Sequence, residues 1–254
     1  MTVQLASSSS CSGAGAGAGL PQTNCADCRL AGICLPISLE IEDIDKLDSI
    51  IQRGRPLQKK DHLYHAGEAF KSVYAVRSGA VKTVKITEDG IEQITGFHLP
   101  GEIIGIDGLA TNLHSNSAIA LETAAVCEIP FSRLEELSVA IPTLQRRFFQ
   151  LMSKEIAEEQ QLITMLSKNS AEERLAALLL SIATRNQYRG LSAKEFHLPM
   201  SRSDIGNYLG LTIETVSRIF TRLNKSGIIT LDKKHIQIND IDALRSSSLS
   251  SCKD

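Results

Sequence analysis

The spacing of apolar residues changes along the chain, and each spacing predicts a different kind of element. Between residues 41 and 51, apolar positions recur every three or four residues with acids between them, which predicts a short amphipathic helix. From residue 56 to about residue 131, short runs rich in Val, Ile and Thr alternate with glycines, which predicts strands joined by turns. The Asp89-Gly90 pair adds a hairpin, because it tolerates positive φ. This part of the chain is therefore expected to form an antiparallel β-roll.

A long helical stripe begins at Ile141-Pro142 and ends near residue 168. A helix of this length can pack against the roll, against a second copy of the chain, or against both. Acidic residues at 155, 158 and 159 interrupt the apolar stripe. The residues that we expect between two copies are Phe148, Leu151, Met152, Ile156, Glu159 and Ile163.

The C-terminal part predicts a helix around residues 172–189, a short strand over 195–198, two short helices and a hairpin. Ser201 can cap the first short helix, with Asp204 completing a capping box, and Gly210 ends it. Thr212 can cap the second helix. Two capped helices separated by a glycine are typical of a helix-turn-helix.

The second short helix has one apolar face and one polar face. A recognition helix needs this division, because its polar face enters the major groove of DNA. Arg218 can pair with a guanine edge, Glu214 can accept from a cytosine amine, and the hairpin after the helix carries a basic tip suited to the DNA backbone. The predicted DNA-binding residues are Ser201, Thr212, Glu214, Ser217, Arg218, Lys233 and Lys234.

Length and composition bound these predictions. The chain has 254 residues, 43% of them hydrophobic and 22% charged, which suits two modest folded domains and excludes a chain that is disordered throughout. The first 21 residues are small, polar and glycine-rich, and we expect a flexible tail there. No uninterrupted apolar run and no basic leader is present, so we expect a cytoplasmic protein without a membrane span.

The charge is divided unevenly along the chain. Residues 1–168 carry 15 Lys and Arg against 20 Asp and Glu, whereas residues 169–254 carry 12 against 9. The C-terminal surplus of positive charge is small, but it agrees with an anionic partner such as double-stranded DNA.

The cysteines supply the other candidate chemistry. Without a secretory leader, six cysteines are not expected to form disulfides, because cytosolic thiols stay reduced. Three of them follow a C-x₂-C-x₅-C spacing, and a fourth lies far downstream near the end of a predicted strand. Thiolates in this number suit an iron–sulfur cluster and zinc alike, and free structural thiols are the third alternative. The candidate metal ligands are Cys25, Cys28, Cys34 and Cys127, while Cys11 and Cys252 are assigned no role.

These motifs together resemble the CRP/FNR superfamily of bacterial transcription regulators, and within it the oxygen-responsive FNR-type branch. The resemblance covers about residues 22–245 and is carried by the four cysteines, by Glu92-Gln-Ile-Thr-Gly-Phe-His-Leu99, and by Ile205-Gly-Asn-Tyr-Leu-Gly-Leu-Thr-Ile-Glu-Thr-Val-Ser-Arg218. It implies that the cysteines hold an oxygen-labile [4Fe–4S] cluster and that the long helix forms a homodimer while the cluster is intact. It also implies that Glu214, Ser217 and Arg218 read a TTGAT-type palindrome, with RNA polymerase as a further partner.

Two rival functions are weighed against this one. The superfamily's roll binds cyclic nucleotides elsewhere, and Gly101-Glu102 is retained here, but no Arg or Lys lies between Lys85 and Arg133 to hold a phosphate. Nothing in the chain resembles a catalytic dyad or a phosphate loop, so no enzymatic activity is expected.

Arg29, next to Cys28, is a candidate for the cation that stabilises a cluster, or else an ordinary solvated side chain.

The expected fold class is α+β, with an N-terminal antiparallel β-roll of the jelly-roll, cyclic-nucleotide-binding type, a long dimerisation helix and a C-terminal winged helix-turn-helix. We expect a disordered tail over residues 1–21, a cysteine-cluster segment over 22–38, a roll sensor domain over 39–140, the dimerisation helix over 141–168, and the DNA-binding domain over 169–250.

Overall fold

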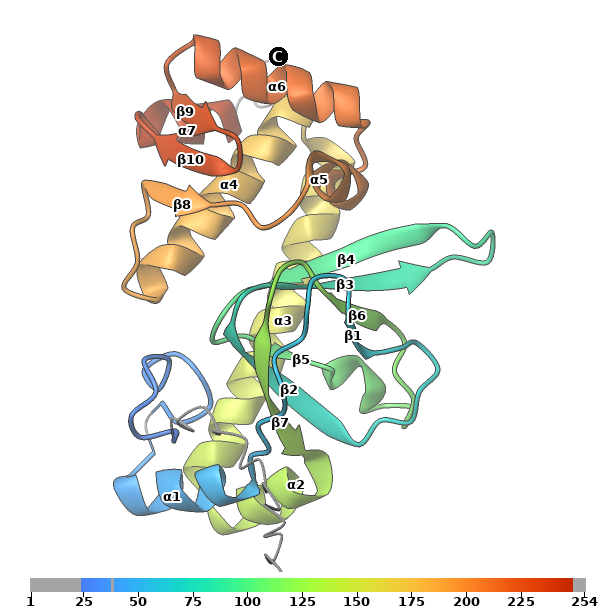
Figure 1. Ribbon diagram of the computed structural model, residues 1–254, viewed down its shortest axis with the longest axis vertical. Coiled ribbons are helices and arrows are strands. Elements are labelled where there is room, and N and C mark those ends of the chain that lie inside the picture. Colours follow the sequence, from blue (N-terminus) through green and yellow to red (C-terminus); the bar gives the residue numbers. More distant parts are fainter. Residues whose placement is uncertain (1–23, 38, 249–254) are drawn as a thin grey trace, which may run out of the picture.

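A β-roll, a long helix and a helical C-terminal domain follow one another along the chain in the computed structural model, which describes residues 24–37 and 39–248 (Figure 1). The helices are α1 (Ile41–Ile50), α2 (Phe131–Ala140), α3 (Pro142–Lys168), α4 (Ala171–Tyr188), α5 (Arg202–Leu209), α6 (Ile213–Lys225), α7 (Ile241–Ser248) and the short 3₁₀ helix η1 (Ile106–Gly108). The strands are β1 (His62–Tyr64), β2 (Ser72–Ser78), β3 (Val81–Ile86), β4 (Glu92–His98), β5 (Ile103–Ile104), β6 (Ser117–Ala120), β7 (Ala125–Pro130), β8 (Glu195–His197), β9 (Ile229–Asp232) and β10 (His235–Ile238).

Two antiparallel sheets make the roll, one in the order β1-β6-β3-β4 and the other in the order β5-β2-β7. Tyr64, Val76 and Val81 belong to one buried cluster that joins strands of both sheets. The predicted hairpin is confirmed between β3 and β4, where Gly90 has a φ of 75°. The antiparallel roll expected from the sequence is therefore present.

The helices α1, α2 and α3 pack around β2 and β7 (Figure 1). Their shared cluster includes Leu47 of α1, Leu134 of α2, and Leu144 of α3, all buried. The long helix begins at Pro142, as the sequence predicted, because proline tolerates the first helical turn. The sequence did not predict α2, whose ten residues carry only a short apolar pattern.

The C-terminal domain confirms the predicted caps. Ser201 accepts from the backbone N–H of Asp204 in a capping box at α5, and Thr212 accepts from Thr215 at α6. Gly210 ends α5 in the left-handed region, with φ 64°. The strands β9 and β10 follow α6 as a wing and pair with β8, which precedes α5, in a small sheet of order β8-β10-β9. The final helix α7, which the sequence did not predict, packs on α4.

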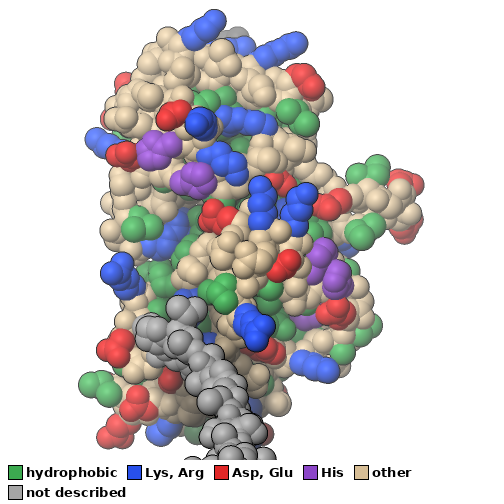
Figure 2. All heavy atoms as spheres, in the orientation of Figure 1, with side chains coloured by type: hydrophobic (Ala, Val, Ile, Leu, Met, Phe, Trp, Pro, Cys, Tyr) green, Lys and Arg blue, Asp and Glu red, His purple; other side chains and the backbone are tan. Residues whose placement is uncertain are grey.

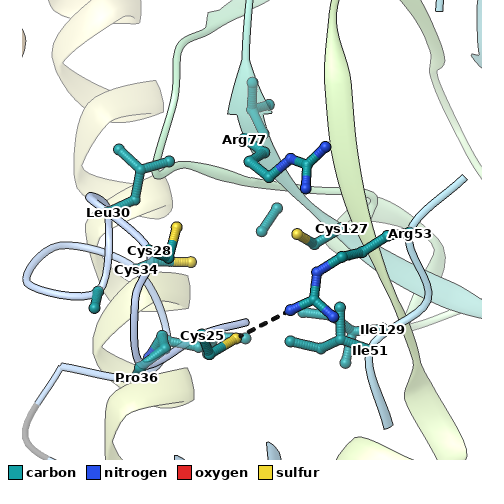
Figure 3. Close-up of a pocket in the computed structure, with 14 residues that line it drawn as sticks. Cys25, Cys28, Leu30, Cys34, Pro36, Ile51, Arg53, Arg77, Cys127 and Ile129 are labelled. Carbon is teal, nitrogen blue, oxygen red and sulfur yellow. Dashed lines mark hydrogen bonds between the residues drawn. The ribbon is translucent and has the colours of Figure 1, made fainter. Parts of the chain in front are cut away.

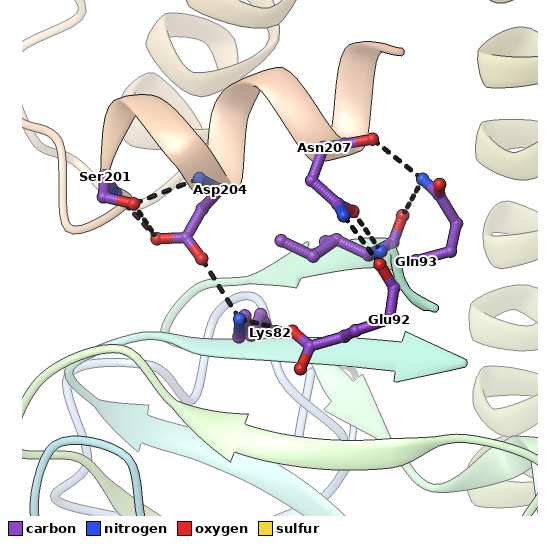
Figure 4. A network of polar contacts seen from close by, with 7 residues as sticks. Lys82, Glu92, Gln93, Ser201, Asp204 and Asn207 are labelled. Atoms are coloured by element: carbon purple, nitrogen blue, oxygen red, sulfur yellow. Dashed lines mark hydrogen bonds and ion pairs between the residues drawn. The ribbon is translucent and has the colours of Figure 1, made fainter. Parts of the chain in front are cut away.

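The C-terminal domain is docked on the roll at what we call the roll–α5 junction, formed by Lys82 and residues 92–94 of the roll with Asp204 and Asn207 of α5 (Figure 4). Asn207 accepts from the backbone N–H of Ile94 at 2.6 Å, and its amide donates to the carbonyl of Glu92 at 2.7 Å. Lys82 lies between Glu92, at 2.8 Å, and Asp204, at 3.1 Å. The junction thus fixes how the helix-turn-helix sits relative to the roll.

One buried apolar cluster continues across this junction. Phe97 of β4 packs against Tyr208 of α5 with ring centroids 4.9 Å apart, and the cluster runs on to Leu175 and Phe220. Within the described residues, no helix is both long enough and apolar enough to cross a bilayer.

Candidate metal centre and candidate DNA interface

Four cysteines from two distant parts of the chain line one pocket (Figure 3). Cys25, Cys28 and Cys34 lie on the consecutive turns of residues 24–37, which we call the cysteine segment, and Cys127 faces them from β7. All four are free thiols, and the pocket holds about 460 Å³ of atom-free space, counting its open mouth. The structure therefore brings together the four predicted ligands, while Cys11 and Cys252 lie outside the described residues.

The sequence suggested that Cys127 lies at the end of a strand. In the structure it lies inside β7. It pairs with Ala75 of β2, and β7 continues to Pro130, which pairs with Ser72. Proline is accepted there because β7 is the edge strand of its sheet and ends at that residue.

The cysteine segment is held by a few specific contacts. Asp48 of α1 accepts from the backbone N–H of Cys25 at 2.7 Å. Arg147 of α3 donates to the carbonyl of Ile33 at 2.7 Å and to that of Cys34 at 3.3 Å. Leu35 is buried in the cluster that contains Leu144 and Phe148. The segment that carries three of the thiols is thus attached directly to the long helix.

Burial dominates the electrostatics of the pocket. Desolvation, joined by the neighbouring carboxylate of Asp48, raises the pKa of Cys25 to about 12, and burial raises the pKa of Cys34 to about 12. Burial also raises the pKa of Cys127, although the cations of Arg53 and Arg77 oppose it. These thiols are therefore protonated at neutral pH when no metal is bound, and metal binding must release their protons.

The donor set fits a polynuclear iron–sulfur group, because four sulfur atoms line one apolar pocket. Among the described residues, no three Cys, His, Asp or Glu side chains lie close enough together to hold one ion. The sulfur atoms instead face one another across the pocket, Cys28 and Cys34 on one side and Cys127 on the other (Figure 3). Soft thiolates spread around an apolar hollow are the ligands expected of a cluster that spans the space between them.

The cation nearest to the thiols was missed by the sequence. Arg29 is exposed and does not line the pocket, whereas Arg53, after α1, lines it and approaches the Sγ of Cys25 at 3.7 Å (Figure 3). Only the fold brings Arg53 to this site, because 28 residues separate it from Cys25. Its proximity to the pocket could not be inferred from spacing.

The polar face of α6 is the candidate DNA surface. Glu214, Ser217 and Arg218 are all exposed, while Val216, Phe220 and neighbouring apolar residues are buried against the rest of the domain. Hydrogen bonds from its own backbone N–H and from Thr212 hold the pKa of Glu214 below its usual value. The carboxylate is therefore ionised at neutral pH and available as an acceptor.

The other predicted DNA residues differ in how free they are. Lys233 is exposed at the tip of the wing, in the left-handed region with φ 53°. Lys234 is half-buried, and its ammonium donates to the carbonyl of Pro199 at 2.7 Å. The hydroxyl of Ser201 is engaged with Asp204 in the cap of α5.

Figure 2 shows Lys and Arg side chains over this domain, at the top of the view, and acids over α1 at the lower left.

The long helix keeps an apolar stripe at its surface. Phe149, Ile156 and Ile163 follow one another at seven-residue spacing and are 59%, 54% and 67% exposed. Phe148, which the sequence placed between two copies, is only 7% exposed and packs within the protomer against Phe131 of α2. The neighbouring Phe149 takes its place on the exposed face. Leu151 and Met152 are half-buried, and Glu159 is exposed.

Glu102, which the sequence related to nucleotide binding in the superfamily, contacts Arg185 of the C-terminal domain in this structure. Arg185 of α4 donates through Nε to the carboxylate of Glu102 at 2.7 Å, and also to the carbonyl of Phe97 at 2.6 Å. The backbone N–H of Leu99 donates to the same carboxylate at 2.8 Å. Glu102 is thus committed to the contact between the roll and the C-terminal domain.

Comparisons with known proteins agree with this architecture. Residues 54–139 match the cyclic nucleotide-binding domain family, and residues 173–247 match the Crp-like helix-turn-helix domain family. The transcriptional activator protein anr of Pseudomonas aeruginosa is 54% identical over 221 residues, which cover 87% of this chain and 91% of that protein. The fumarate and nitrate reduction regulatory protein of Salmonella typhimurium is 48% identical, covering 87% and 88%.

A solved structure supports the same arrangement. FixK2 from Bradyrhizobium japonicum is 31% identical in sequence and superposes with a TM-score of 0.70, over 78% of this chain and 96% of that one. The match thus covers most of this chain and nearly all of the solved one.

Proposed function

This chain belongs to the FNR/Anr-type CRP/FNR family of transcriptional regulators, and from that membership we propose that its four cysteines bind an oxygen-labile [4Fe–4S] cluster that controls its binding to DNA. Membership makes the chain a DNA-binding regulator and not an enzyme. The observation that carries the cluster proposal is that Cys127 of the roll and three cysteines of a separate segment line one pocket.

The cysteines would act as the ligands, and the bound group would supply reactivity toward oxygen. The chain's own residues would connect the bound group to the long helix. While Cys25, Cys28 and Cys34 are tethered to Cys127, Leu35 and the carbonyls of Ile33 and Cys34 stay in place against α3. When the tether is lost, a segment made of turns can leave the helix at little cost, since few other contacts order it.

We propose that α3 pairs with α3 of a second copy through the exposed stripe of Phe149, Ile156 and Ile163, flanked by Leu151, Met152 and Glu159. Seven-residue spacing keeps an apolar seam facing its partner along two helices, and the three exposed side chains have no other cover within the described protomer. A two-fold axis through this seam makes the contact self-complementary. Contacts between the cysteine segment and α3 then bias the geometry of that seam.

Dimerisation presents two α6 helices to successive half-sites of a palindrome, about 34 Å apart. Arg218 and Glu214 would contact base edges, with Ser217 beside them, and Lys233 would contact the backbone. Ser201 and Lys234 have partners within the protein, so their part in DNA binding would require those contacts to rearrange. We further propose that the chain works in the cytoplasm, where bacterial DNA lies, and that it contacts RNA polymerase when it activates transcription.

The test uses the full chain purified without oxygen. We expect visible charge-transfer absorption, stoichiometric iron and sulfide, a dimer in sedimentation, and tight binding to a TTGAT-type palindrome. Exposure to air should bleach the absorption and weaken DNA binding together. A colourless protein containing stoichiometric zinc would contradict the cluster, and cyclic AMP that restored DNA binding in air would support a nucleotide-responsive regulator instead.

A further inference from the structure

We propose that Arg53 is a further binding residue of the cysteine site, which donates a hydrogen bond and supplies positive charge to the group that the four cysteines hold. This inference rests on the proposed function and deepens it. It concerns how firmly the site retains a cluster and does not concern which residues ligate it.

The position of Arg53 is the first support. Its side chain is 9% exposed and lines the pocket from the side of Ile51 and Cys127. Nη2 approaches the Sγ of Cys25 at 3.7 Å and also pairs with the carboxylate of Asp48. Figure 3 shows the guanidinium between Cys25 and Cys127, across the hollow from Cys28 and Cys34.

An unused donor is the second support. Nε of Arg53 is buried and has no hydrogen-bond partner among the described residues. Buried N–H groups are almost always satisfied in folded proteins, so a donor left over at the wall of a pocket points to a partner that occupies the pocket. A cysteine thiolate or an inorganic sulfide would be such an acceptor, and hydrogen bonds to sulfur are known to tune iron–sulfur clusters.

Charge is the third support. A cluster held by four thiolates brings net negative charge into an apolar pocket, where an uncompensated charge is costly. Arg53 carries the opposite charge within hydrogen-bond reach of a ligand sulfur. Asp48 neutralises part of it, but the same carboxylate also accepts from the backbone N–H of Cys25, so it fixes both Arg53 and the first ligand. The pair is thus arranged to hold the arginine beside the sulfur atoms.

The experiment measures how fast iron leaves the anaerobically reconstituted full chain when an excess of chelator is added. Arg53→Met keeps the bulk of the side chain and removes its charge and donors. We expect iron to leave about 10- to 100-fold faster from this variant, the range found when groups that support metal ligands are removed. Arg53→Lys, which keeps the charge but not Nε, should fall between. The exposed Arg55 provides the matched control, and Arg55→Met should match the wild type.

A second variant separates binding from a structural role. Asp48→Asn keeps an oxygen for the N–H of Cys25 but breaks the ion pair. If Arg53 acts on the bound group, this variant should lose iron more slowly than Arg53→Met, because the arginine keeps its charge and its donors. If Asp48→Asn and Arg53→Met lose iron equally fast, and both lower the unfolding temperature of the metal-free protein equally, the pair only supports the fold and the proposal is overturned.

Failure of this inference differs from failure of the proposed function. A wild-type chain that takes up no iron and sulfide under anaerobic reconstitution would overturn both. A wild type that takes up both, with Arg53→Met losing iron at the wild-type rate, would overturn only the role of Arg53.

Discussion

The cysteine segment and the roll–α5 junction both join a separate part of the chain to the roll, yet they are held in different ways. The junction joins two regular elements through paired polar groups and through an apolar cluster shared by both domains. The cysteine segment consists of turns and is attached by Asp48, Arg147 and the buried Leu35. The contacts of the junction therefore all lie within the chain, whereas under the proposed function the order of the cysteine segment also depends on the group that its thiols would bind.

The largest expected effect tests that dependence. Serine in place of Cys34 or Cys127 should abolish stable uptake of iron and sulfide, because the remaining ligands cannot close the site. The C-terminal domain should stay folded, with unchanged far-UV circular dichroism. Cys11→Ser is the control and should take up iron and sulfide normally. Full uptake by Cys127→Ser would show that the site is not built from the four cysteines named here.

A pair of buried leucines compares the stability of the two regions directly. Leu35 of the segment is 1% exposed and Leu209 of α5 is 0% exposed. Leu209→Ala should lower the free energy of unfolding by about 2–5 kcal/mol, the usual cost of a cavity. Leu35→Ala should cost only about 1 kcal/mol in the metal-free protein, since the segment can detach without unfolding the rest. Urea unfolding measures both, and equal losses would refute the contrast.

DNA binding tests which residues of the C-terminal domain contact bases and which contact the DNA backbone. Arg218→Ala should weaken binding by about 1–3 kcal/mol per half-site and relax the preference at one base pair. Lys233→Ala should weaken all sequences alike and lower the salt slope by about one unit. Binding isotherms on matched and mismatched palindromes at several salt concentrations distinguish them. If Arg218→Ala left base preference intact, Arg218 would be a phosphate contact.

Removing a polar contact of the roll–α5 junction should lower the free energy of unfolding by a smaller amount. Asn207→Ala removes two hydrogen bonds to the backbone of β4, and should cost about 1 kcal/mol in unfolding free energy. Amide exchange of Ile94 should accelerate, because its N–H loses its acceptor. Ser203→Ala, on the exposed side of α5, is the control. Unchanged exchange at Ile94 would mean that the apolar cluster alone holds the domains together.

The smallest expected effect concerns Glu155 of α3. Burial, with the nearby Glu158 and Glu159, raises the pKa of Glu155 to about 7. The folded chain thus holds a proton that the unfolded chain releases near pH 4.5, so this contribution to stability is complete at low pH and is lost as the pH rises through about 7.

Glu155→Gln should therefore make the unfolding temperature fall less between pH 5.5 and pH 8, by an amount equivalent to less than about 1 kcal/mol. Glu135→Gln, exposed on α2, serves as the control. Identical pH profiles for Glu155→Gln and the wild type would show that Glu155 stays ionised in the folded chain.

The sequence by itself determined the parts of this protein that depend on neighbouring residues. Ser201 and Thr212 cap α5 and α6 as predicted, because a cap requires only the few residues that follow it. The apolar face of α6 follows from a period of 3.6 residues, and the hairpin between β3 and β4 follows from a short turn sequence. The ligand candidates were also visible, because cysteines are few and their spacing is regular.

Only the tertiary structure decided which residues meet across long separations. Arg147 reaches Ile33 across 114 positions, and Asn207 reaches Ile94 across 113. Nothing in local spacing distinguishes Arg53 from Arg29 as the cation of the cysteine site, or Phe149 from Phe148 as the exposed aromatic of α3. The physical reason is that burial is set by the packing of whole elements. Residues of the roll pack against one side of α3 and line the pocket that contains Arg53. No short stretch of sequence encodes either contact.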